Sequence, residues 1–178
     1  VENSVYDQVI AYHGPDGMDA RSRAYDYTPY DETVLLDSDM LFLKPMDHYW
    51  DLMQNKELFI CTSPQNYKGQ TFSYGFYRKV FEKDLLPDVY SAWTYFKKSA
   101  LAQDFFDTVK LLTDNQELAI QSYLHNSQLD SLPTDEAFAV ALRITDLIDH
   151  ATEPRWDFPR ITHMTVSYTH LRAHETDS

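Results

Sequence analysis

The sequence has 178 residues, of which 43% are hydrophobic and 15% aromatic. That is enough apolar side chain for one packed globular domain and too much for a disordered or fibrous chain. The formal net charge of −13 argues against a nucleic-acid groove or an anionic membrane surface as partner, because both need clustered lysine and arginine.

The cysteine content and the N-terminus bear on location. A single cysteine, Cys61, permits no internal disulfide and is typical of a reducing compartment. No apolar run is long enough to cross a membrane, and the first residues lack the charged and apolar regions of a signal peptide. We therefore expect a cytoplasmic protein. Because the chain enters on a predicted strand without an initiator Met, we also expect natural sequence to precede it.

The first part of the chain alternates predicted strands and helices. Residues 5–12 are rich in β-forming types and end at a turn cluster, which predicts a strand. Residues 19–27 predict a short helix, with Asp19 as its cap or first-turn acid. Residues 33–36 predict a short apolar strand of the kind that is buried on both faces in a parallel sheet.

The middle of the chain continues the alternation. Residues 46–53 predict one or two helical turns after Pro45, and residues 58–62 predict a strand. Residues 63–78 are polar and aromatic, which predicts a long loop. Residues 88–98 contain an aromatic-rich strand.

The last part is mainly helical. Ser99 is predicted to cap a helix that runs to about residue 112, and a second helix is predicted over 117–124. Thr134 is predicted to cap a third helix over 135–144, and residues 161–164 predict a last strand. Interleaved strands and helices indicate an α/β architecture with a mostly parallel sheet. With only four glycines, a Gly-rich phosphate loop is excluded.

The clearest chemical motif is Asp37-Ser38-Asp39, directly after the predicted strand 33–36. In open α/β sheets ligands bind at the carboxyl ends of the strands. Two carboxylates separated by one residue can turn toward one hard cation such as Mg²⁺ or Mn²⁺, which in turn can chelate a diphosphate. The alternative is an ordinary turn or cap. The apolar residues on both sides favour a cation site, because desolvated like charges are costly without one.

The segment around this motif resembles a family of enzymes. Residues 21–41 place a basic residue on a helix before a strand ending in Asp-x-Asp. This is similar to the donor-site segment of glycogenin-like and bacterial lipopolysaccharide-type retaining glycosyltransferases, including phage-encoded relatives. The resemblance implies that a Lys or Arg sixteen residues before the first Asp approaches the donor diphosphate and sugar. Arg21 has that spacing and Arg23 is the neighbouring candidate; the alternative for either is a solvated helix face.

Further residues extend the resemblance. Residues 90–99 resemble the family's Asn-Ser-Gly strand and the helix after it, with Tyr90 and Ala92 in place of Asn and Gly. Asp135 resembles the acid that opens the next helix and faces the transferred sugar, where it would make a polar contact or stabilise an ion pair. Its alternative is a first-turn acid favoured by the helix dipole. His163 resembles the histidine that completes the metal site with Asp37 and Asp39.

The resemblance, which covers about residues 5–164, implies a GT-A fold, an α/β Rossmann-like mixed and mostly parallel sheet flanked by helices. The implied activity is metal-dependent transfer of a sugar from a nucleoside diphosphate sugar to a hydroxyl of a glycan, lipid-linked or protein acceptor. The cofactor would be Mn²⁺ or Mg²⁺. Arg21, Arg23 and Asp37-Ser38-Asp39 would bind the donor, and Arg21 and Asp135 would act in catalysis.

Two other functions compete with this one. A phosphotransferase or phosphatase with Asp37 as nucleophile would resemble haloacid-dehalogenase-like enzymes, but that family has Gly-Thr where Met40-Leu41 stands. A non-catalytic carbohydrate-binding or interaction module is suggested by the aromatic residues of the long predicted loop. These are Tyr67, Phe72, Tyr74 and Tyr77.

The C-terminal residues are expected to be foreign to the domain. Residues 166–176 read VSYTHLRAHET, which resembles a transposase-delivered sequencing adapter translated from its third nucleotide. We therefore expect a fragment from metagenomic sequencing, with a domain at residues 1–164 and a non-native tail at 165–178. No metal site is assigned to His170, His174 or Glu175. Parts that the family uses are expected before and after the domain.

Overall fold

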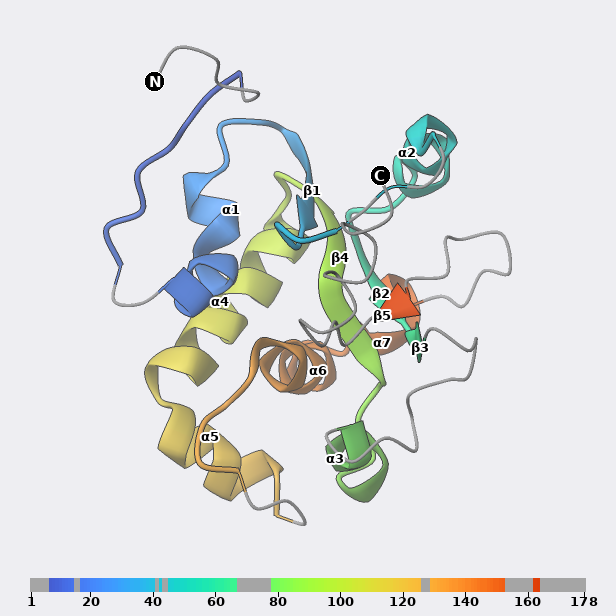
Figure 1. The fold of residues 1–178 in the computed structure, drawn as a ribbon. Helices are drawn as coiled ribbons and strands as arrows, with labels where there is room; N and C mark the ends of the chain where they lie inside the picture. Colours follow the sequence, from blue (N-terminus) through green and yellow to red (C-terminus); the bar gives the residue numbers. More distant parts are fainter. Residues whose placement is uncertain are drawn as a thin grey trace, which may run out of the picture.

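The structure is a computed structural model that describes residues 7–14, 17–40, 42, 45–66, 78–125, 129–152 and 162–163, with backbone alone at 17–19 and 162–163. It is a mixed α/β fold (Figure 1). In chain order its elements are η1 (Gly17–Arg23, a 3₁₀ helix), α1 (Ala24–Tyr27), β1 (Glu32–Leu36), α2 (Asp47–Met53), β2 (Leu58–Thr62), β3 (Gln65–Asn66), α3 (Lys79–Lys83), β4 (Val89–Lys97), α4 (Ala100–Asp114), α5 (Gln116–Tyr123), α6 (Thr134–Ile144), α7 (Ile148–Ala151) and β5 (Thr162–His163).

The main sheet has three strands in the order β1-β4-β2. Both pairs are antiparallel, with Leu36 opposite Trp93 in one and Leu58 opposite Phe96 in the other. The mostly parallel sheet that we expected is therefore not seen in the described residues, where the parallel pair is β3 with β5. The error has a physical cause: the prediction rested on the short apolar run 33–36 and on the interleaving of strands with helices, and neither pattern records the direction of the neighbouring strand.

Strand β1 is less buried than predicted. We expected residues 33–36 to be covered on both faces, but they are half-buried and Leu36 is 39% exposed. Within the described residues β1 pairs with β4 alone, so it lies at an edge of this sheet. A short apolar run does not show whether a strand is central or at an edge.

Side chains alternate across the sheet and divide the core in two. Leu58 and Ile60 of β2, with Phe96 of β4, face a large cluster built with α4 and α6. Phe59 and Tyr95 face a smaller cluster that includes Met53 of α2. This alternation is the period of two expected of a strand with both faces covered. The sheet therefore lies between the α4–α6 layer and α2 (Figure 1).

Aromatic rings hold the α4–α6 layer together. Phe105 of α4 meets Phe138 of α6 edge to face with ring centroids 5.2 Å apart, and Phe106 packs on Phe96 of β4 at 4.8 Å. Edge-to-face pairs add about 0.5–1.5 kcal/mol to the free energy gained by burying the rings. Residues Glu136–Leu142 of α6 are all buried, so α6 is a central helix.

The helix predictions are largely confirmed, with one corrected cap. The Ser99 side chain accepts a hydrogen bond from the N–H of Ala102 at 3.2 Å, as its predicted role as cap of α4 requires. Thr134, in contrast, is the first residue of α6. The capping position belongs to Pro133, and no side-chain cap is found there among the described residues. Proline fits because its fixed φ suits the extended backbone at this position.

The remaining predictions have mixed outcomes. The predicted helix 19–27 appears as η1 followed by α1, and the predictions at 46–53, 58–62, 88–98 and 117–124 correspond to α2, β2, β4 and α5. The strand predicted at 5–12 is wrong for its described part, where residues 7–12 form no strand and Val9 is 77% exposed. β-forming side chains make a strand only where a neighbouring backbone completes the hydrogen bonds. The short elements β3, α3 and α7 were not predicted.

The strand predicted at 161–164 appears as the two described residues of β5, which pair with β3 outside the main sheet. Most of the loop predicted at 63–78 lies outside the described residues. Among the helices that the structure describes, none has the length and apolar character needed to cross a membrane.

Candidate functional site

Asp37 follows β1 directly and lies on the side of the sheet that packs against α4 and α6. Leu35 packs against the α4–α6 cluster and Val34 against the α2 cluster, so the alternation along β1 carries Asp37 toward the side of Leu35. The chain then turns, with the N–H of Met40 donating to the carbonyl of Asp37 at 3.2 Å. Asp37 is half-buried, whereas Ser38 and Asp39 are exposed.

Arg21 meets Asp37 at this turn. One guanidinium nitrogen of Arg21, Nη2, forms an ion pair with Oδ1 of Asp37. The other, Nη1, donates to the hydroxyl of Ser91 at 3.0 Å. The two side chains of the ion pair are 23% and 32% exposed, so both remain accessible from solvent. Arg21 and Asp37 lie sixteen residues apart in the sequence, the spacing that the resemblance singled out, and the fold places them in contact.

Asp135 joins the same group from the first turn of α6. Its Oδ1 accepts hydrogen bonds from the Ser91 N–H at 2.8 Å and from the Ser91 hydroxyl at 2.6 Å. Its Oδ2 accepts from Nη1 of Arg78 at 2.8 Å. The Asp135 side chain is only 14% exposed. With these donors the carboxylate is held on both of its oxygens.

Arg78, just before α3, is fully buried and ends this chain of contacts. Its Nε donates to Oδ1 of Asp88 at 2.7 Å, and its Nη2 donates to the carbonyl of Val89. The guanidinium also lies 4.5 Å from the ring centroid of Phe81, a cation–π contact. We call the sequence of contacts Asp37–Arg21–Ser91–Asp135–Arg78 the polar relay.

Burial raises the pKa of two carboxylates next to Arg78 and Asp135, at the buried end of the relay. Burial raises the pKa of Asp88, although the neighbouring Arg78 guanidinium opposes the shift. Burial also raises the pKa of Glu136 to about 7, with a smaller contribution from the charge of Asp135. Oδ2 of Asp88 and Oε2 of Glu136 are buried without a hydrogen-bond partner in the described part of the chain. Glu136 is therefore a group that can exchange a proton near neutral pH.

The other predicted site residues are placed differently. Arg23 points elsewhere, since its ion pair is with Asp114 at the end of α4. Ser38 and Asp39 are exposed, and Asp39 makes no hydrogen bond or ion pair with any described residue. For His163 only the backbone is described, in β5 beside Asn66 of β3. The structure thus brings together Arg21, Asp37 and Asp135, leaves Arg23 apart, and does not test the side chain of His163.

The donor set at the turn suits a hard divalent cation in part. Asp37 and Asp39 offer carboxylate oxygens from one turn, the ligand type that Mg²⁺ and Mn²⁺ prefer. One oxygen of Asp37 is engaged by Arg21, which leaves its second oxygen for a cation. No group of three potential metal ligands occurs among the described side chains, a set that does not include His163. The residues present therefore fit as two ligands of a metal ion.

The sequence did not reveal the inner members of the relay. Ser91 lies in the strand that carried the resemblance, but it was given no role. Arg78 is the last residue of the predicted loop 63–78, where a basic residue is expected to be solvated, because arginine is seldom fully buried unless paired. Its partners Asp88 and Asp135 lie 10 and 57 residues further along the chain. Local sequence patterns do not predict contacts over such separations.

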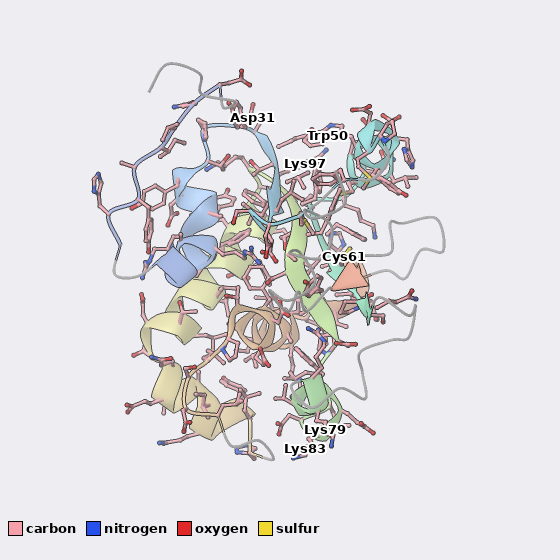
Figure 2. The ribbon with its side chains drawn as sticks, in the orientation of Figure 1. Asp31, Trp50, Cys61, Lys79, Lys83 and Lys97 are labelled. Carbon is pink, nitrogen blue, oxygen red and sulfur yellow. The ribbon has the colours of Figure 1, made fainter. Side chains whose placement is uncertain are left out.

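A separate cavity of about 690 Å³ lies on the opposite side of the sheet, between β1, β4 and α2. Its rim includes Phe42 and Trp50, which are 46% and 40% exposed; Trp50 is labelled on α2 in Figure 2. Its described lining is Val34, Leu36, Phe42, Met46, Asp47, His48, Trp50, Asp51, Met53 and Trp93. The cavity thus combines aromatic faces with two carboxylates.

Comparisons with protein-family models, with curated proteins and with solved structures found no match to this chain. Function therefore has to be inferred from the side chains gathered at the end of β1.

Proposed function

We propose that this chain is a metal-dependent glycosyltransferase domain that moves a sugar from a nucleoside diphosphate sugar to an acceptor hydroxyl. One observation carries the proposal: Arg21 of η1 contacts Asp37 at the end of β1 and is linked through Ser91 to Asp135 at the start of α6. Three residues that are distant in sequence, and that the resemblance selected for one donor site, meet in one place. We further propose that the described sheet and its helices belong to a GT-A domain within residues 1–164.

Arg21 is suited to the diphosphate of the donor. Its guanidinium is a planar fork that can pair with phosphate oxygens through two parallel hydrogen bonds. Because the side chain is partly exposed beside Asp37, its Nη2 can exchange that carboxylate for a phosphate oxygen while Nη1 stays on Ser91. It would stabilise the negative charge that develops on the leaving diphosphate.

The acidic turn would hold the cation. Asp37 and Asp39 would bind Mn²⁺ or Mg²⁺, with His163 as the proposed third ligand. When bound, the metal supplies positive charge that neutralises the leaving nucleoside diphosphate. This accounts for how a chain with a net charge of −13 can accept an anionic donor.

Asp135 and Ser91 would act mainly by orienting Arg21. Asp135 is largely buried, and both of its oxygens accept hydrogen bonds from Ser91 or Arg78. This leaves little of the carboxylate to meet the sugar directly, which shifts its proposed role from sugar contact toward support of the site.

Binding of a nucleoside diphosphate tests the proposal. In calorimetric titrations with the diphosphates of uridine, guanosine, adenosine and cytidine, we expect at least one to bind when Mn²⁺ is present. Chelation with EDTA should abolish the signal, and Asp39→Ala should weaken binding by about tenfold or more, as loss of metal-site residues commonly does. Asp104→Ala, at an exposed position on α4, is the matched control. Binding that is indifferent to both EDTA and Asp39→Ala would rule the proposal out.

A carbohydrate-binding module without catalysis is the second candidate. The observation that favours it is the cavity of about 690 Å³ with Phe42, Trp50 and Trp93 in its lining, since aromatic faces and nearby carboxylates suit sugar rings. The loop aromatics that first suggested it, residues 67–77, lie outside the described part of the chain. This candidate requires binding of a neutral oligosaccharide that survives EDTA and is lost in Trp50→Ala.

A further inference from the structure

We propose that Arg78 is a positioning residue for the candidate site: through Asp135 and Ser91 it fixes the guanidinium of Arg21. The consequence for donor binding rests on the proposed glycosyltransferase function. The positioning itself is a property of the polar relay and can be measured without any ligand.

Arg78 has the environment of a fixed group. Its side chain is fully buried, and a buried guanidinium is costly unless its donors are satisfied. The Arg78 guanidinium donates hydrogen bonds to three acceptors: Oδ1 of Asp88, Oδ2 of Asp135 and the carbonyl of Val89. The ring of Phe81 covers the guanidinium at 4.5 Å. Because Asp88 and the Val89 carbonyl hold the guanidinium of Arg78 in place, its contact with Asp135 has a fixed position.

Asp135 transmits this constraint to Ser91. One oxygen of the carboxylate accepts from Arg78, and the other accepts from both the N–H and the hydroxyl of Ser91. Because the two oxygens belong to one rigid plane, fixing Oδ2 also fixes the direction that Oδ1 presents to Ser91. Loss of the Arg78 contact would leave the carboxylate held through Oδ1 alone, so that its plane could turn about that oxygen.

Ser91 passes the constraint to Arg21 through the direction of its hydroxyl. A serine hydroxyl has one proton to donate and two lone pairs that accept. Here the proton goes to Asp135, which leaves a lone pair to accept Nη1 of Arg21 at 3.0 Å. If Asp135 were displaced, the hydroxyl could rotate and its proton could face the guanidinium, where it would repel the donor. The orientation of Arg21 therefore depends on an arginine that it does not touch.

Arg78 contacts two carboxylates, and substituting each in turn separates its structural role from its positioning role. Asp88 lies just before β4 and its contact ties α3 to the sheet. Asp135 alone continues to Ser91. Asp88→Asn should therefore lower stability with little effect on Arg21, whereas Asp135→Asn should disturb Arg21 as well.

The ligand-free experiment follows the guanidinium of Arg21 by ¹⁵N nuclear magnetic resonance. In the unsubstituted chain we expect slow rotation about the Nε–Cζ bond and protected N–H signals. In Arg78→Lys, which keeps the charge but loses the fork, and in Asp135→Asn, the Arg21 signals should exchange faster. The matched control is Arg143→Lys, which alters an arginine that clamps the carbonyls of Asp84 and Leu85 outside the relay. Unchanged Arg21 signals in a folded Arg78→Lys or Asp135→Asn protein would overturn the proposal.

A double-mutant cycle then links positioning to ligand binding. With Mn²⁺ and the nucleoside diphosphate that binds the unsubstituted chain, Arg78→Lys should lower the affinity for that nucleotide about fivefold, the size expected of coupled neighbours. In an Arg21→Ala background the same change should have almost no further effect. A purely structural role would lower affinity equally in both backgrounds and would refute the coupling. If the unsubstituted chain binds none of the diphosphates, the glycosyltransferase proposal fails, while the resonance experiment still decides the role of Arg78.

Discussion

The carboxylate of Asp135 accepts two hydrogen bonds from Ser91, one from the main-chain N–H at 2.8 Å and one from the hydroxyl at 2.6 Å. The two residues are 44 positions apart. Their contact ties the first turn of α6 to β4, and it sets the direction of the hydroxyl that Arg21 meets. The polar relay therefore connects the packing of the core helix with the accessible end of β1.

Replacing Asp135 with asparagine should destabilise the fold. The amide nitrogen of asparagine would face either the Arg78 guanidinium or the Ser91 donors, and both contacts pair a donor with a donor. Unpaired buried groups of this kind cost about 1–3 kcal/mol. Urea unfolding should show a loss of that size in Asp135→Asn. Asp130→Asn, at an exposed position before α6, serves as the control, and equal stabilities for the two variants would contradict the expectation.

Removing the Arg21 side chain should affect metal and nucleotide in opposite directions. Arg21→Ala removes a positive charge beside Asp37, so repulsion of a cation at that carboxylate falls. Mn²⁺ alone should bind about two- to threefold more tightly, a modest gain because solvent screens the partly exposed pair. Nucleoside diphosphate with Mn²⁺ should bind about tenfold more weakly, since a charge-assisted contact is lost. Electron paramagnetic resonance of free Mn²⁺ and calorimetry measure the two effects. Weaker binding of Mn²⁺ alone would count against the proposed exchange of partners.

Alanine substitutions at Ser91 and Ser99 should have different effects on nucleotide binding and on stability. Ser91→Ala removes the hydroxyl between Arg21 and Asp135 but keeps the main-chain N–H that Asp135 also accepts. Nucleotide affinity should fall about fivefold, with little loss of stability. Ser99→Ala removes the cap of α4 and should cost about 1 kcal/mol of stability without an effect on nucleotide binding. A Ser91→Ala variant that binds nucleotide as tightly as the unsubstituted chain would argue against the relay.

Glu136 should make stability depend on pH. Burial raises its pKa in the folded chain from 4.5 to about 7, so the folded state holds a proton that the unfolded state has already released. Stability linked to this proton is present at low pH and is lost as the pH rises from about 5 to about 7. The Glu136→Gln variant lacks this loss. Relative to the unsubstituted chain it should gain stability across that interval, by on the order of 1–3 kcal/mol. Urea unfolding of both proteins at pH 5, 6, 7 and 8 measures the difference, and parallel curves would contradict it.

The proposed third metal ligand can be tested directly. If His163 binds the cation together with Asp37 and Asp39, His163→Ala should reduce Mn²⁺ affinity by about tenfold or more. His125→Ala changes an exposed histidine after α5 and should leave the affinity unchanged. Equal affinities for the two variants would remove His163 from the site while leaving the two aspartates in place.

Local patterns in the sequence were sufficient for most of the secondary structure. The apolar face and serine cap of α4, the apolar run of β2 and the aromatic run of β4 all lie where they were predicted. These features depend on neighbours within a few residues, so composition and spacing reveal them. Arg21 is a different case: its spacing from Asp37 singled it out as a candidate for donor binding only because the segment resembles a donor site, and its ion pair with Asp37 was not predicted.

Only the tertiary structure decided strand direction and the polar relay. The direction of β4 is set by which strands lie beside it, and a run buried on both faces does not record that. Arg78 is buried because Asp88 and Val89, at the start of β4, and Asp135, in the first turn of α6, all contact its guanidinium. Their joint contacts offset the cost of desolvating its charge, and this balance exists only once the chain has folded. By itself, therefore, the sequence determined most of the longer helices and strands and pointed to Asp37 as a site residue, whereas folding determined which charged side chains meet there.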